Sequence, residues 1–97
     1  EPAWTQIWRV AKHFGVIGEE LPLTKSIMEG VLKEGRPIIC SMRPGDFTTT
    51  GHFIVITGIK DGQFTVNDPN STERSNMLWD YDTLKAQISN LWAFQAL

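Results

Sequence analysis

Two residues of this sequence could perform acid–base chemistry together. His52 opens an apolar run, and Asp68 follows the next apolar run, on the far side of a glycine turn. Runs separated in this way are typical of neighbouring strands in a hairpin, which can hold an imidazole and a carboxylate side by side. Such an imidazole is a positioned general base, or the cationic partner of a thiolate. The alternative is structural: a half-buried histidine at a strand edge, next to an ordinary Asn-Asp-Pro-Asn turn.

Whether the two side chains meet depends on the connection between the strands, because side chains alternate between the faces of a sheet. A two-residue turn would place Asp68 opposite Val55, on the face away from His52. A three-residue loop over residues 60–62, with its glycine left-handed in a bulge, would place Asp68 opposite Ile54 and diagonal to His52. A functional pair therefore predicts the three-residue loop.

Helices are expected on either side of these strands. A first amphipathic helix, ended by Gly15, carries an apolar stripe made of Trp4, Ile7, Trp8, Ala11 and Phe14. Thr24 can cap a second helix, which Gly35 ends, and its inward face consists of Ile27, Met28, Val31 and Leu32. Asp80 can cap a third helix, marked by Tyr81, Leu84 and Ile88.

The remaining segments predict strands and loops. The compact apolar run 37–42 is typical of a buried strand, and 91–94 of a closing strand. Residues 43–50 and 70–75 are loops by composition. We therefore expect residues 1–97 to form a single α+β unit, an antiparallel β-sheet with flanking helices.

Composition excludes several classes of function. The 97 residues carry a net charge of −2 with scattered Lys and Arg, which gives no electrostatic basis for binding nucleic acid. No apolar run is long enough to span a membrane. One cysteine and two distant histidines provide no metal-ligand spacing, and there is no glycine-rich phosphate loop. We therefore expect neither a metal nor another cofactor.

Three segments together resemble one known family. Gly35-Arg36-Pro37-Ile38-Ile39-Cys40, the His52-led strand Gly51–Gly58 and Asn67-Asp68-Pro69 resemble the C-terminal half of the papain-like cysteine peptidases related to the bacteriocin-processing, double-glycine-leader peptidases. The resemblance implies the sheet-bearing C-terminal lobe of a papain-like fold. It also implies that His52 is the catalytic base and that Asp68 orients it. The substrate would be a peptide or protein, and a bacterial, secreted or cell-surface setting is implied.

The sequence departs from this family in one important respect. Family members carry a glutamine and then a nucleophilic cysteine that opens a helix in the N-terminal lobe, and no such segment is present here. We therefore expect the nucleophile on an N-terminal lobe upstream of this chain, which would be inactive alone. Cys40 could replace it in a Cys-His-Asp order, but its apolar run indicates a buried, unreactive thiol. The competing hypothesis is a non-catalytic papain-like module that binds a peptide or protein partner.

Four further features have weaker functional interpretations. His13 is expected at the surface, near the end of the first helix. Trp79 and Trp92 are expected in the core, and the resemblance implies that either could shield the histidine–acid hydrogen bond from water. The segment 46–50 either borders a substrate cleft or is a polar connection.

Overall fold

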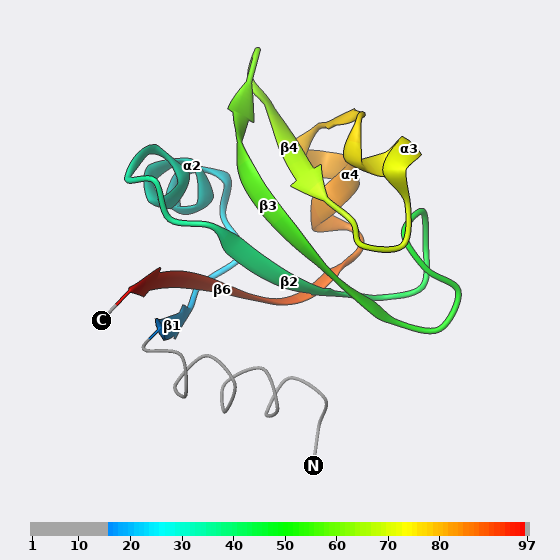
Figure 1. Ribbon diagram of the computed structural model, residues 1–97, viewed down its shortest axis with the longest axis horizontal. Helices are drawn as coiled ribbons and strands as arrows, with labels where there is room; N and C mark the ends of the chain where they lie inside the picture. Colours follow the sequence, from blue (N-terminus) through cyan, green and yellow to red (C-terminus); the bar gives the residue numbers. More distant parts are fainter. Residues whose placement is uncertain (1–15, 97) are drawn as a thin grey trace.

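The fold is an antiparallel sheet flanked by helices, as predicted (Figure 1). The computed structural model describes residues 16–96, so the predicted first helix and His13 lie outside the described residues. Within residues 16–96, six strands form the sheet in the order β1-β6-β2-β3-β4-β5, and every neighbouring pair is antiparallel. The strands are β1 Val16–Glu20, β2 Ile38–Met42, β3 His52–Lys60, β4 Gln63–Asn67, β5 Leu78–Trp79 and β6 Ile88–Ala96. The helices of this part of the chain are α2 Lys25–Lys33, α3 Thr72–Ser75 and α4 Tyr81–Lys85.

Helix α2 packs against β2 and β3 and contributes to the main core. It begins after Thr24, as predicted, and the chain leaves it through Gly35, whose φ of 80° is a left-handed conformation that glycine adopts without strain. Three of the four predicted inward residues are buried, namely Met28, Val31 and Leu32. Ile27 was wrongly assigned to this face, because it is 38% exposed.

One face of the sheet carries most of the core, because side chains alternate along each strand. On β2, burial alternates residue by residue, so the side chains of Ile38, Cys40 and Met42 point into the core. The paired strand β3 adds Ile54 and Ile56 on the same face. Since Met42 is the partner of His52, the histidine also lies on this face, where β3 begins.

The β3–β4 hairpin corrects the prediction of a three-residue loop. Lys60 pairs with Gln63, so the connection is a two-residue turn, and both of its residues, Asp61 and Gly62, have positive φ. The register instead shifts by one residue at a bulge at Thr57. On the His52 side of the bulge, the two strands have the register that the three-residue loop would have produced. Asp68 therefore reaches the face of His52 by a different route from the one predicted.

The segment after β4 also differs from prediction. Residues 70–75 were expected to be a loop, but they contain helix α3, which Ser71 caps by accepting a hydrogen bond from Arg74 N at 3.0 Å. Helix α4 begins after Asp80 as predicted and ends at Lys85, so the expected helical residue Ile88 instead begins β6. Among the described residues, no helix is long and apolar enough to cross a membrane.

Candidate active site

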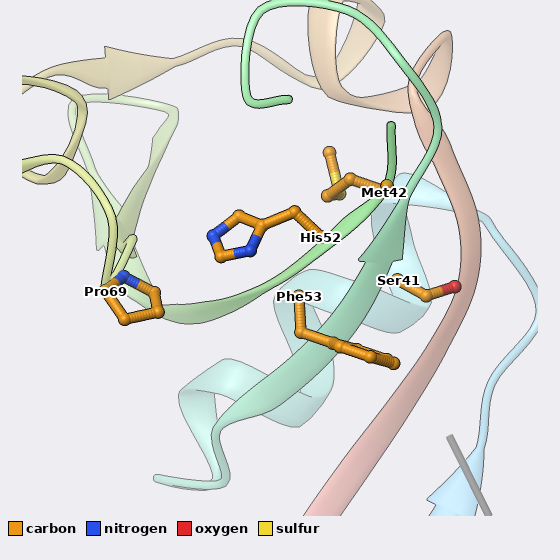
Figure 2. Close-up of a pocket in the computed structure, with 6 residues that line it drawn as sticks. Ser41, Met42, His52, Phe53 and Pro69 are labelled. Atoms are coloured by element: carbon orange, nitrogen blue, oxygen red, sulfur yellow. The ribbon is translucent and has the colours of Figure 1, made fainter. Parts of the chain in front are cut away.

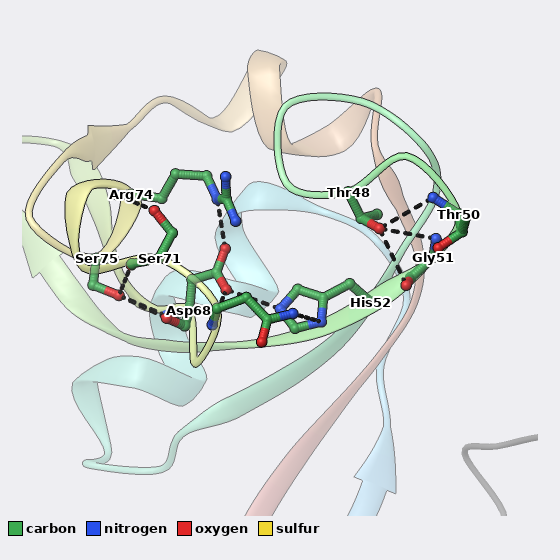
Figure 3. A network of polar contacts seen from close by, with 9 residues as sticks. Thr48, Thr50, Gly51, His52, Asp68, Ser71, Arg74 and Ser75 are labelled. Atoms are coloured by element: carbon green, nitrogen blue, oxygen red, sulfur yellow. Dashed lines mark hydrogen bonds and ion pairs between the residues drawn. The ribbon is translucent and has the colours of Figure 1, made fainter.

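The structure brings His52 and Asp68 together (Figure 3). His52 Nε2 and Asp68 Oδ1 are 2.8 Å apart, a hydrogen-bond distance. The imidazole is 13% exposed, whereas the carboxylate is fully buried, with a side-chain exposure of 0%. The expected geometric pair therefore exists, with the acid in the interior and the base at the surface.

Asp68 accepts hydrogen bonds at both carboxylate oxygens. Besides His52, the backbone N–H of Asn70 donates to Oδ1 at 2.8 Å, and Arg74 Nε donates to Oδ2 at 2.6 Å. Burial alone would raise the pKa of Asp68, but the hydrogen bonds from Arg74, Asn70 and His52, together with the charge of Arg74, outweigh it and hold this pKa below its ordinary value of 3.8. Asp68 is therefore an ionised acceptor near neutral pH.

The ionised acid fixes the proton of the neutral imidazole. Because a carboxylate can only accept, the proton in the 2.8 Å contact belongs to His52 Nε2, which leaves Nδ1 as the basic nitrogen. The side-chain amide of Asn70 lies 3.3 Å from Nδ1 and donates to it. The arrangement can therefore accept a proton at Nδ1 from a neighbouring group that displaces Asn70.

A surface depression of about 500 Å³ lies beside this histidine (Figure 2). Its lining is mainly apolar and consists of Ser41, Met42, Gly51, His52, Phe53 and Pro69. In Figure 2 the imidazole projects from β3 towards Pro69, the residue that follows the acid. The depression thus offers room for a reacting group next to the base.

The family comparison fits this geometry. The model of the Peptidase_C39-like family matches residues 2–96. The chain belongs to this family. A search of curated proteins returned no match. Membership gives the chain a peptidase-related character, in agreement with the resemblance of its His52-led strand.

Within this peptidase-related chain, Cys40 is not a candidate nucleophile. It has no exposed surface, lies opposite Ile54 of β3 and Leu91 of β6, and points into the core. Burial raises the pKa of its thiol far above the ordinary value, so the reactive thiolate is not populated. Among the described residues, no group of three or more His, Cys, Asp or Glu could hold a metal ion.

Trp79 and Trp92 are buried, as predicted for core residues. Trp92 pairs with Ile39 and so lies on the sheet face opposite His52, which excludes it as a shield for that residue. Trp79 packs on Phe47, with ring centroids 4.4 Å apart. A shielding role for Trp79 stays a prediction.

Two contacts at or near the candidate site were not expected from the sequence. Arg74 was overlooked because its segment was assigned to a loop, although Ser71 followed by Thr-Glu-Arg fits a helix N-terminus. Gln87 was also missed: it accepts from Asp46 N at 2.7 Å and donates to Asp46 Oδ2 at 2.9 Å. These bonds fix the polar loop that leads to Gly51 at the depression. No local pattern marks Gln87, because its partner is 41 residues away.

Proposed function

We propose that this chain supplies the base of a thiol-dependent peptide-bond hydrolase. In the proposed reaction, His52 Nδ1 takes the proton of a cysteine thiol, and the thiolate attacks the carbonyl carbon of a peptide or protein substrate. The imidazolium then gives this proton to the leaving amine, and a thioester remains. Water, deprotonated by the same nitrogen, hydrolyses the thioester and regenerates the thiol. Asp68 holds His52 in the required tautomer and orientation throughout.

The observation that carries this proposal is the hydrogen bond from His52 Nε2 to an ionised, buried Asp68. It leaves Nδ1 basic in a residue that lines an open depression. In this proposal the nucleophile is a cysteine outside the 97 residues, because their one cysteine is Cys40, whose thiol is buried. We therefore place the nucleophile and the oxyanion donors on an N-terminal lobe. We regard this chain as the C-terminal part of the domain, which would be inactive alone.

One observation favours a second candidate, a non-catalytic module that binds a peptide or protein partner. The side-chain amide of Asn70 already donates to Nδ1, the basic nitrogen of His52. Both ring nitrogens are therefore hydrogen-bonded without a thiol. In such a module the apolar depression would serve binding and the histidine would keep the surface ordered.

Thiol labelling distinguishes the two candidates. The longest natural form of the protein is treated with a small alkylating agent at neutral pH, and peptide mapping locates the label. The proposal expects rapid labelling of a cysteine outside the 97 residues, slowed by His52→Ala and unaffected by Cys40→Ser. If no thiol reacts rapidly, the binding module takes precedence.

A further inference from the structure

The carboxylate of Asp68 accepts hydrogen bonds on two sides, and the histidine lies on only one of these sides. His52 approaches Oδ1, whereas the guanidinium of Arg74 approaches Oδ2 at 2.6 Å (Figure 3). The backbone N–H of Asn70 also donates to Oδ1. Arg74 makes the shortest of these contacts and brings the positive charge. A buried carboxylate with a single weakly basic partner would be costly to ionise, so the arginine is central to the state of the acid.

The backbone of Arg74 is itself fixed by the surrounding fold. Its N–H donates to the cap residue Ser71 at 3.0 Å, and its carbonyl accepts from Trp79 Nε1 at 3.1 Å. The ring of Trp79 is in turn packed on the buried Phe47. The position of the guanidinium therefore depends on helix α3 and the short strand β5, and not on a flexible loop.

The same helix fixes the backbone of the acid. Asp68 N donates to Ser75 Oγ at 2.8 Å, and this hydroxyl lies 2.8 Å from Ser71 O, to which it can donate. Both the backbone and the far oxygen of Asp68 are thus anchored on residues 71–75. The remaining oxygen, Oδ1, is left in place for the imidazole.

We propose that Arg74 is a positioning residue, which anchors Asp68 Oδ2 so that Oδ1 orients His52, and that the functional unit is Arg74–Asp68–His52. Its catalytic consequence rests on the proposed function, but its effect on the acid and on the imidazole does not. Arg74 touches neither substrate nor nucleophile in this role. It acts through Asp68 alone.

The test replaces Arg74 with methionine in the longest natural form of the protein and follows Asp68 and His52 by NMR. The carboxyl carbon of Asp68 reports its titration, and the ring nitrogens of His52 report the tautomer. In Arg74→Met, we expect the pKa of Asp68 to rise and the Nε2–H tautomer to lose its dominance. The matched control is Arg36→Met, since Arg36 also pairs with carboxylates, at 3.6 and 3.9 Å, but at the far end of β2. It should change neither signal.

Two further variants keep the proposal falsifiable if Arg74→Met does not fold. Arg74→Lys retains the charge, and Arg74→Gln retains a donor without charge. We expect the lysine variant to keep Asp68 ionised over the wild-type pH range and the glutamine variant to raise its pKa. Equal titration in the two variants, or unchanged signals in a folded Arg74→Met, would overturn the proposal.

Peptide hydrolysis, measured on the same variants, separates this inference from the proposed function. If the NMR signals shift as expected but no form of the protein hydrolyses peptides, the positioning role stands and the peptidase proposal fails. If the protein is a peptidase, the acid limb of its pH–rate profile should shift to higher pH in Arg74→Met. In Arg74→Lys it should return towards its wild-type position. If the pH–rate profiles of both variants equal that of the wild-type peptidase, the proposed role of Arg74 is contradicted.

Discussion

Replacing Asp68 with asparagine keeps the shape of the side chain and exchanges one acceptor oxygen for an NH₂ group. An amide can satisfy the donors on only one side. If its oxygen faces His52 and Asn70, its NH₂ meets Arg74 Nε–H at a contact that is now 2.6 Å. If its oxygen faces Arg74, its NH₂ meets two N–H groups at 2.8 Å. The carboxylate is therefore required by its surroundings.

The cost follows from these contacts. Each orientation loses at least one hydrogen bond to a charged or buried group, so the free energy of unfolding should fall by about 2 kcal/mol. The bond to the charged arginine is the stronger one, which favours the amide oxygen facing Arg74. The NH₂ group would then donate to His52 Nε2, so the proton would move to Nδ1. On the proposed function, a base in the wrong tautomer should lower kcat on the order of 10⁴-fold.

We would measure the free energy of unfolding in urea, the tautomer of His52 by NMR, and peptide hydrolysis with the longest natural form of the protein. Asp80→Asn is the matched control, because Asp80 caps α4 through Oδ1, which accepts from Thr83 N at 2.7 Å, and asparagine caps helices equally well. An Asp68→Asn protein with wild-type stability and an intact Nε2–H tautomer would refute the reasoning.

Three other predictions follow from the described residues. Cys40 should react with thiol reagents only when the protein unfolds. A labelling rate in native buffer that exceeds the unfolding rate would contradict its burial. Gly45→Ala should destabilise by about 1–3 kcal/mol in urea unfolding, because its Cβ would lie 2.4 Å from the Oε1 of the hydrogen-bonded Gln87. The control Gly30→Ala, at an exposed helical site with open space around the new Cβ, should stabilise by about 0.5–1 kcal/mol. Because the pKa of Asp68 is lower in the folded protein than its ordinary 3.8, its stabilising effect should be complete above that value and vanish as the pH falls through the folded pKa. A stability difference from Asp68→Asn that is constant from neutral pH to pH 3 would exclude this linkage.

Much of the local structure could be predicted because its causes are local. Thr24, Gly35 and Asp80 all lie at the predicted helix ends. Gly35 is left-handed and Asp80 caps its helix through a side-chain hydrogen bond, whereas the side chain of Thr24 makes no cap hydrogen bond. The compact apolar run 37–42 predicted the buried strand β2, and the alternation of side chains along a strand predicted the face shared by His52 and Ile54. These signals extend over a few residues and need no tertiary partner.

The hairpin shows how a correct expectation can have a wrong cause. Asp61-Gly62 was expected to lie within a longer loop, whereas it forms the two-residue turn that this pair of residues favours. The missing register shift lies at Thr57, beside Gly58, and a glycine inside a strand is a recognisable sign of a bulge. Gly58 therefore marked the bulge in the sequence, whereas the bulge was expected at Gly62, in the turn.

The residue pattern alone was enough to single out His52, Asp68 and the strands next to them as a candidate site. That the two side chains meet could be known only from the folded sheet, because a one-residue shift of register moves a side chain to the opposite face. Only the tertiary structure brought Arg74 to the far oxygen of the acid. A buried charge needs partners that converge from several directions, and residues that converge in space leave no fixed spacing in the chain.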